Sequence, residues 1–340
     1  MKVVIMAGGR GTRISELFPD IPKPLIPIEE TPVLERELIS LRNQGFTDFI
    51  FTVSYLADKI IAYFGNGEKW GVNIEYFIEE NPLGNAGALF FLKDKIGDED
   101  FLLLNADAVF DVDFNRMVEY HYSHNALVTL FTHPNSHPYD SGLIIADKDG
   151  NVEKWLAKED ERLVWYKNRV NAGLHVLSPK ILEMSNINKE EIGKIGADGK
   201  IKKVDLDRQL LKPLAGTGQM YCYDSPEYVK DMGTPERFKA VEEDYKKGTV
   251  NAKNLANKQK AVFLDRDGTI NKYVGFLRKE EEFELLPGVA EAIKKINASG
   301  YLVVVVTNQP VIARGEVTYA QLENIHNKME TLVTIHGLFV

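Results

Sequence analysis

The strongest constraint on the fold is an alternation of apolar, strand-like runs with helix-like stretches in the first third of the chain. Strands are predicted at Val3–Met6, Phe49–Val53, Ile74–Ile78 and Phe101–Leu104. Helices are predicted between these strands, at Pro32–Asn43, Leu56–Phe64 and Asn85–Lys95. Repeated strand–helix–strand units are typical of a mostly parallel sheet that helices cover.

The pattern changes after the fourth predicted strand. From Leu127 to Val176 the apolar runs are short and are broken by polar turns such as Asp149-Gly150-Asn151, which favours antiparallel pairing. A helix at Pro235–Lys246 has proline in its first turn and is followed by the stop signal of Lys247 and Gly248. We therefore expect an α/β fold with a Rossmann-like mixed, mostly parallel sheet flanked by helices.

A chain of 340 residues is too long for one ordinary domain, and a second α/β pattern follows the first. We predict a first domain at 1–247, a polar linker without apolar periodicity at 248–259, and a second domain at 260–340. The second domain is predicted to contain a strand at Ala261–Leu264, a helix at Pro287–Ala298, a strand at Leu302–Val306 and a helix near Thr318–Leu332.

The composition excludes several classes of partner. A net charge of −9 argues against nucleic-acid binding, which needs a basic surface. The longest apolar stretch, Tyr301–Val306, is far shorter than the roughly 20 residues that cross a bilayer, and the N-terminus lacks the apolar segment of a signal peptide. One cysteine, Cys222, cannot form an internal disulfide. We expect a soluble, cytoplasmic protein with no nucleic-acid and no membrane partner.

A glycine-rich turn, GGRGTR at residues 8–13, follows the first predicted strand, and PKPL follows at residues 22–25. Glycines at such a turn let backbone N–H groups approach phosphates, and the cations Arg13 and Lys23 can neutralise a triphosphate. The order fits neither a dinucleotide fingerprint, whose sixth position would be glycine, nor a Walker loop, which needs G-K-[S/T]. A surface turn with two solvated cations is the alternative interpretation.

Two carboxylates stand where a cation can be held. Asp107 ends the apolar strand in LNAD, the position at which ligands bind in open α/β sheets, and Asp231 lies in KDMGTPE. Each aspartate taken singly could equally be a cap or a solvated loop residue.

These segments together resemble the sugar-phosphate nucleotidyltransferase family over roughly Met1 to Glu243. The family signature is G-G-x-G-T-R followed by P-K-P-L, and KDMGTPE is similar to its D-[I/M]-G-T-P-E. The segment NPLGNAGA resembles the family's P-L-G-T-A-G-A, with Asn85 in place of threonine. LNAD resembles its N-G-D metal site, with Ala106 in place of glycine.

The resemblance implies a reaction and its partners. A sugar 1-phosphate oxygen attacks the α-phosphorus of a nucleoside triphosphate, pyrophosphate leaves, and no protein nucleophile is required. Mg²⁺ is the implied cofactor, because it neutralises the charge that accumulates on phosphate oxygens. The resemblance leaves room for a homo-oligomer.

The resemblance also assigns roles to residues. The catalytic set is Arg13, Lys23, Asp107 and Asp231, of which Asp107 and Asp231 hold the metal. The nucleotide-binding set is Ala7, Gly8, Gly9, Gly11, Thr12, Gly84 and Asn85. The sugar-phosphate-binding set is Lys158, Asn171 and Gly142.

The choice of Lys158 leaves an alternative open. Lys158 resembles the lysine of the family's E-K motif, although Ala157 stands in place of the glutamate, and it precedes the sugar-contacting segment Asn171-Ala172-Gly173 by a family-like interval. A literal Glu153-Lys154 lies upstream, and a solvated lysine in a charged run is the structural alternative.

A second site is predicted where VFLDRDGT, at residues 262–269, delivers two carboxylates onto a glycine turn. Asp265 could attack a phosphoryl group, while Asp267 protonates the leaving oxygen and later activates water. A calcium loop would need more oxygen ligands at close spacing.

This segment resembles motif one of the haloacid dehalogenase-like phosphatases, and the segment at residues 306–309 resembles motif two, in which Thr307 binds the phosphoryl group. TNQ followed by IARG is similar to heptose 1,7-bisphosphate and histidinol phosphate phosphatases, although Pro310-Val311 replaces serine-glycine. The family's lysine and later aspartates stand further downstream than the sequence given, so we expect an incomplete domain with little phosphatase activity. The phosphatase-like site is Asp265, Asp267, Thr307, Asn308 and Arg314.

The pairing of the two resemblances favours one substrate. A heptose bisphosphate phosphatase makes a heptose 1-phosphate, so our specific hypothesis is transfer of GMP from GTP to D-glycero-α-D-manno-heptose 1-phosphate, giving GDP-heptose for surface polysaccharide synthesis. Mannose 1-phosphate with GTP, or glucose 1-phosphate with UTP, CTP or dTTP, are the alternatives. A regulatory subunit that binds nucleotide sugars without chemistry is the alternative of another class.

Overall fold

The computed structural model describes residues 1–9, 11–135 and 142–334. Arg10, in the glycine-rich turn, lies outside the described residues. Within the described residues, no helix combines the length and the apolarity that crossing a membrane would require.

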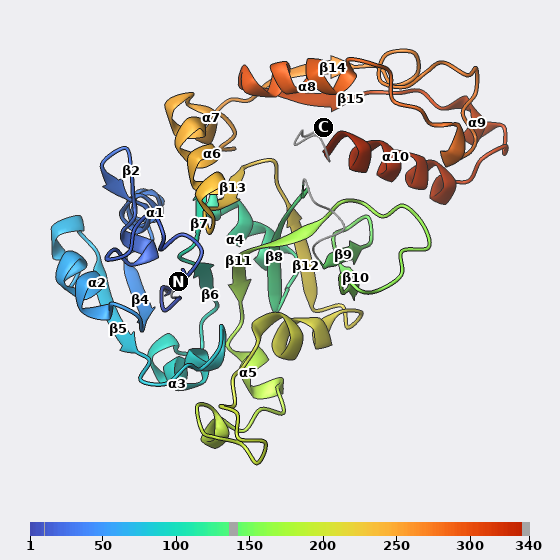
Figure 1. Cartoon of the computed structure of the whole chain (residues 1–340). Coiled ribbons are helices and arrows are strands. Elements are labelled where there is room, and N and C mark those ends of the chain that lie inside the picture. Colours follow the sequence, from blue (N-terminus) through green and yellow to red (C-terminus); the bar gives the residue numbers. More distant parts are fainter. Residues whose placement is uncertain (10, 136–141, 335–340) are drawn as a thin grey trace.

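A seven-stranded sheet forms the centre of the first unit, with the strand order β12-β8-β11-β6-β1-β4-β5 (Figure 1). The parallel neighbours are β6 with β1, β1 with β4, β4 with β5, and β12 with β8. β11 runs antiparallel to both of its neighbours, β6 and β8. The predicted mixed, mostly parallel sheet is thereby confirmed. Its strands are β1 (Val3–Met6), β4 (Asp48–Val53), β5 (Asn73–Ile78), β6 (Phe101–Asn105), β8 (Val128–His133), β11 (Val170–Leu177) and β12 (Met220–Asp224).

Helices cover both faces of this sheet, because neighbouring residues in its central strands point to opposite sides. In β1, Val3 and Ile5 belong to one buried cluster with α1, α2 and α4, whereas Val4 belongs to a second cluster with α3 and α5. The helices are α1 (Val33–Asn43), α2 (Ala57–Phe64), α3 (Gly87–Ile96), α4 (Phe114–Ser123), α5 (Lys180–Met184) and α6 (Pro235–Lys246).

Short pairs of strands stand beside the central sheet. β7 (Ala108–Asp111) pairs antiparallel with β13 (Tyr228–Asp231), and Ala108 lies opposite Asp231. This pairing joins segments more than a hundred residues apart and brings the two predicted metal-binding aspartates to one edge. The other pairs are β9 (Leu143–Ala146) with β10 (Val152–Leu156), and β2 (Pro27–Ile28) with β3 (Thr31–Pro32).

The predicted linker is more ordered than its polar composition indicated. It contains a short helix, α7 (Thr249–Ala252), whose Val250 is buried in a cluster with Phe238 and Val241 of α6. The few apolar residues of this segment form no periodic pattern, so the sequence did not reveal this contact.

The C-terminal unit has a parallel pair of strands, β14 (Lys260–Leu264) and β15 (Tyr301–Val305), as the apolar runs predicted. Its helices are α8 (Val289–Ala298), α9 (Pro310–Ala313) and α10 (Tyr319–Thr334). Figure 1 shows α10 between this pair of strands and the first unit. Phe263 of β14 is 68% exposed, so one face of this small sheet carries uncovered apolar surface.

We predict that Leu104→Ala destabilises the protein by about 2–5 kcal/mol, because Leu104 is fully buried in the central strand β6 and its removal leaves a cavity. Urea unfolding followed by circular dichroism measures the loss. Leu163→Ala is the matched control, because Leu163 is 77% exposed and should change stability by no more than about 0.5 kcal/mol. Equal midpoints for the two variants would contradict the assignment of β6 to the core.

Candidate active site

A buried lysine joins the two predicted metal-binding aspartates. Lys23 lies in the short 3₁₀ helix η1 (Lys23–Leu25) and is 9% exposed. Its Nζ donates to Asp107 Oδ2 at 3.1 Å and to Asp231 Oδ1 at 3.5 Å. The β7–β13 pairing places both aspartates within reach of Lys23. The Met232 N–H also donates to the Asp107 carbonyl at 3.3 Å.

Arg13 approaches the same point from the glycine-rich turn. A Cβ added at Gly233 would lie 3.2 Å from Lys23 Nζ and 3.5 Å from Arg13 Nη2. The Gly233 N–H donates to Asp231 Oδ1 at 2.5 Å, so glycine at this position leaves the cations room beside that carboxylate. The four residues predicted as catalytic therefore meet in one place, although the chain separates them widely.

Glu37 of α1 is an ionisable residue that interacts electrostatically with Asp107 and Lys23, and the sequence analysis missed it. It is 2% exposed, and neither carboxylate oxygen has a hydrogen-bond partner among the described residues. Burial raises the pKa of Glu37 well above its ordinary value, Asp107 raises it further, and Lys23 opposes the change. The protonated, neutral form of Glu37 is thereby favoured over the charged form. A single glutamate in a helix pattern gives no sign of this burial.

A cleft of about 600 Å³ opens beside the aspartates. Its wall carries Asp107 and Asp231 together with Asn85, Asn171 and Asp207. The other polar or charged side chains of the wall are Asn105, His133, Asn135, His175, Lys230, Arg237 and Thr334. A polar cleft with a cationic and anionic edge is suited to a phosphorylated, hydroxyl-rich ligand.

Asn171 is fixed within this cleft by three neighbours. Its Oδ1 accepts from the Gly173 N–H at 3.2 Å and lies 3.0 Å from His175 Nε2. Because the Gly173 contact identifies Oδ1 as the acceptor, His175 must carry its proton on Nε2. The Asn171 Nδ2 donates to Asp207 Oδ1 at 3.2 Å.

Asp207 and Arg237 are cleft residues outside the predicted set. Burial raises the pKa of Asp207 to about 6, with a further increase from Asp205 and a decrease from the Asn171 hydrogen bond. Arg237 of α6 forms an ion pair with Asp231. Arg237 directly follows the KDMGTPE motif in the first turn of α6, so the sequence could have indicated that it lies near Asp231. No motif contains Asp207.

Three of the predicted nucleotide-binding glycines lie in close contact with other segments of the first unit. A Cβ at Gly8 would lie 3.4 Å from Ser54 Cβ and 3.8 Å from Glu79 Oε1, and one at Gly11 would lie 3.2 Å from Lys23 Cβ. Gly84 has a φ of +86°, and a Cβ there would come within 2.3 Å of the Val204 carbonyl oxygen. Only glycine combines this backbone conformation with so close an approach.

Asn85, which replaces the family's threonine, has a structural contact. Its Oδ1 accepts from the Leu206 N–H at 2.8 Å and so holds the segment that carries Asp207. α3 begins at Gly87, two residues later than predicted. The remaining predicted residues of this set are Ala7, Gly9 and Thr12; Ala7 is buried and donates its N–H to the Thr52 carbonyl at 2.8 Å.

The structure does not bring Lys158 and Gly142 into the cleft. Lys158 is exposed in the turn after β10, and neither residue is among the described residues that line the cleft. Gly142 lies instead against Trp155, with 3.0 Å between an added Cβ and the indole Nε1. Lys230 and Arg237 are the described cations in the wall. The interval between Lys158 and Asn171 could not reveal this, because a distance along the chain does not determine where an exposed turn lies in space.

The phosphatase-like residues lie at the ends of β14 and β15. The Arg266 side chain is fully buried and binds Asp267 with two nitrogens, Nε to Oδ1 at 3.1 Å and Nη2 to Oδ2 at 2.9 Å. Gln309 Nε2 donates to Asp267 Oδ2 at 2.7 Å and to Thr307 Oγ1 at 2.8 Å, and Asn271 Nδ2 donates to Asp267 Oδ1 at 3.1 Å. Burial raises the pKa of Asp267, but the hydrogen bonds from Arg266, Gln309 and Asn271 outweigh this and lower it.

The other phosphatase-like residues are less constrained. Asp265 Oδ1 accepts from the Arg266 N–H at 2.7 Å. Asn308 is exposed in the loop after β15. Arg314 lies over the Phe276 ring at 4.4 Å and 3.9 Å from Glu316 Oε1.

Comparison with known proteins connects the first unit to one family. Residues 2–248 match the family described as Nucleotidyl transferase. Mannose-1-phosphate guanyltransferase of Candida albicans is 28% identical over 243 residues, which cover 70% of this chain and 62% of the relative. The enzyme of that name from Saccharomyces cerevisiae is also 28% identical, over 70% of this chain and 63% of its own length. The chain thus spans less than two thirds of these relatives.

Solved structures give a similar result. HddC from Yersinia pseudotuberculosis is 25% identical, with a TM-score of 0.57, and covers 72% of this chain and 99% of its own. A second crystal structure of that protein, complexed with GMP-PN, has the same identity, TM-score and coverage. The shared region has the mixed, mostly parallel sheet described above.

We predict that His175, which is 1% exposed, makes the free energy of unfolding depend on pH. Burial lowers the pKa of His175 from 6.5 to about 4, with a partial opposing effect from a backbone hydrogen bond to Leu103. Below pH 6.5 the unfolded chain binds a proton that the native ring refuses, so this contribution is present above pH 6.5 and is lost as pH falls toward 4.

The measurement is the free energy of unfolding of the wild type and of His175→Gln at pH 7 and pH 5. The wild type should lose about 2 kcal/mol more than the variant over this interval, at about 1.4 kcal/mol for each pH unit below 6.5. At pH 8 neither ring nor amide is charged, so the difference there reports packing alone. Parallel pH profiles of the two proteins would disprove the assignment.

Proposed function

Because the chain belongs to the nucleotidyl transferase family, we propose that it joins a nucleoside triphosphate to a sugar 1-phosphate and releases pyrophosphate. The observation that carries the proposal is the convergence of Arg13, Lys23, Asp107 and Asp231 beside a polar cleft. Two cations and two carboxylates at one point are the groups that a triphosphate and its counter-ion require.

The donor set fits a magnesium ion. Asp107 and Asp231 keep 52% and 39% of their side chains exposed, so both offer carboxylate oxygens toward the cleft. Mg²⁺ is usually bound by one or two carboxylates plus substrate phosphates. Asp107 and Asp231 would hold it, and when bound it would supply positive charge to the phosphate oxygens.

The other side chains bind and orient the reactants. Lys23 and Arg13 offer positive charge to the triphosphate, and Lys23 is positioned by burial before any ligand arrives. Asn171 and Asp207 present an amide and a carboxyl group to sugar hydroxyls. A sugar-phosphate oxygen then attacks the α-phosphorus, the bond to pyrophosphate breaks, and no covalent enzyme intermediate forms.

We propose GTP as the nucleotide. The support is that relatives carry the name mannose-1-phosphate guanyltransferase and that HddC has been crystallised with GMP-PN. For the acceptor, D-glycero-α-D-manno-heptose 1-phosphate is our first candidate, because of the phosphatase-like residues in the second unit. Mannose 1-phosphate is the second candidate and is favoured by the names of the relatives.

We predict that the protein releases pyrophosphate from GTP with one of these two sugar 1-phosphates, and that EDTA abolishes the release. The assay compares GTP, UTP, CTP and dTTP against heptose, mannose and glucose 1-phosphates. Thermal stabilisation by GTP without turnover would instead identify a binding subunit. Turnover with glucose 1-phosphate and dTTP alone would reject the guanylyl assignment.

Asp107→Asn should lower kcat/KM by about 100-fold or more, because it removes one of the two carboxylates at the reacting phosphates. Asp94→Asn is the matched control, since Asp94 is exposed on α3 and should leave kcat/KM within about twofold. Equal activity of the two variants would contradict the role of Asp107.

For the second unit we predict no significant phosphate release from a heptose 1,7-bisphosphate. A general acid must give up a proton near neutral pH, whereas Asp267 is held ionised by Arg266, Gln309 and Asn271. Inorganic phosphate release measures this, with Asp265→Asn as the control for a contaminating phosphatase. Robust release that disappears in Asp265→Asn would overturn the prediction.

A further inference from the structure

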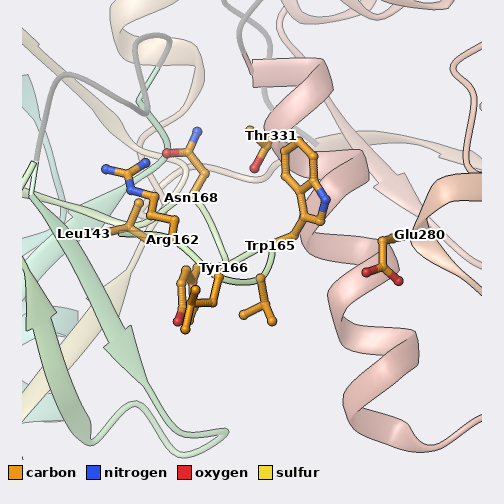
Figure 2. A pocket seen from close by; sticks show the side chains of 9 residues that line it. Leu143, Arg162, Trp165, Tyr166, Asn168, Glu280 and Thr331 are labelled. Atoms are coloured by element: carbon orange, nitrogen blue, oxygen red, sulfur yellow. The ribbon is translucent and has the colours of Figure 1, made fainter. Parts of the chain in front are cut away.

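α10 of the C-terminal unit docks on the first unit next to the cleft. The Trp165 N–H donates to Asn324 Oδ1 at 2.7 Å, and Asn327 Nδ2 donates to the Trp165 carbonyl at 3.0 Å. Figure 2 shows Trp165 lying against α10, with Asn168 and Thr331 around the same cavity of about 270 Å³. The backbone N–H and C=O groups of Trp165, in an irregular segment, thus find their hydrogen-bond partners in side chains of α10.

The last turn of α10 makes a second set of contacts, to Asn168. The Asn168 N–H donates to Glu330 Oε2 at 3.2 Å, and Asn168 Nδ2 donates to Thr334 Oγ1 at 2.7 Å. The same Nδ2 donates to the Asn135 carbonyl at 2.8 Å. Asn168 and Thr334 are each 1% exposed, so these bonds are shielded from water.

These contacts reach the cleft directly. Thr334 and Asn135 are part of the wall that also carries Asp107 and Asp231, and Asn171 follows Asn168 by three residues. Asn168 therefore joins the last turn of α10 to the start of β11, whose Val170, Asn171 and Ala172 line the cleft.

The opposite side of α10 is anchored in its own unit. Ile325 and Met329 pack with Ile270, Leu277 and Phe283, and His326 Nε2 lies 3.1 Å from Arg266 Nη1. α10 is thus held from both sides. Within the described residues, no hydrogen bond or ion pair links α10 to the predicted nucleotide-binding residues; its hydrogen bonds to the first unit go to Trp165 and Asn168.

We propose that α10 is part of the acceptor subsite of the first unit, and that Thr334 acts through Asn168 as a positioning residue for the sugar 1-phosphate. This inference rests on the proposed nucleotidyltransferase function. It assigns the C-terminal unit a role in the transferase reaction that is independent of any phosphatase chemistry. The Trp165–Asn171 segment has the orientation that the sugar requires only while α10 is docked.

The test replaces Thr334 by valine, which keeps the shape of the side chain and removes its hydroxyl. Thr334→Val should raise the KM for the sugar 1-phosphate by about tenfold, which corresponds to roughly 1.4 kcal/mol. The KM for the nucleoside triphosphate should stay within about twofold, because the Thr334 hydroxyl is hydrogen-bonded to Asn168 and to no predicted nucleotide-binding residue among the described residues. Thr331→Val is the matched control, since Thr331 is buried one turn earlier in the same helix.

A second readout does not depend on turnover. Hydrogen–deuterium exchange of the Trp165–Asn171 segment should be faster in Thr334→Val than in the wild type and in Thr331→Val. Equal exchange in the two variants, or a parallel rise of both KM values in Thr334→Val, would overturn the inference. A wild type that releases no pyrophosphate with any substrate pair would defeat the proposed function instead, while the exchange experiment would still decide whether α10 fixes the segment.

Discussion

The contact of one buried lysine with two aspartates is the interaction on which the site depends. Lys23 lies at 3.1 Å from Asp107 and 3.5 Å from Asp231, and it is largely removed from water. Two carboxylates this close to each other would repel without a cation between them. The ion pairs therefore set the spacing of the aspartates in advance, and a ligand that brings its own cation meets a site already arranged for it.

The sheet topology explains how such distant residues meet. Asp107 follows β6, one of the central strands, while Asp231 ends β13, which reaches Asp107 only because β13 pairs with β7. Lys23 arrives through η1 after the first strand. Each segment alone has few contacts that would hold its charged group, but the buried clusters on the two faces of the sheet fix all three supports together.

The two units share more than a linker. α7 packs on α6, and α10 bonds to the segment that leads into β11, so the C-terminal unit is fixed beside the part of the cleft wall that carries Asn171. On the side of α10 that faces the C-terminal unit, Arg266 binds Asp267 and lies within hydrogen-bond distance of His326. The residues that resemble a phosphatase site thereby also contribute to the position of α10. A small α/β unit with exposed Phe263 can thus have a structural role in the first unit.

The sequence by itself determined the strands β1, β4, β5 and β6 and the helices α1, α2, α3 and α6, because apolar periodicity is a local property and Val3–Met6 or Phe101–Leu104 admit few other interpretations. It also selected Arg13, Lys23, Asp107 and Asp231 as candidates, since their motifs are contiguous, and these four side chains lie close together in the structure. Only the tertiary structure decided that Glu37 is buried beneath Lys23, that Asp207 and Arg237 face the cleft, and that Lys158 does not. Those outcomes depend on which distant segments pack against each other, and burial, pKa and contact distance have no signature in a single stretch of chain.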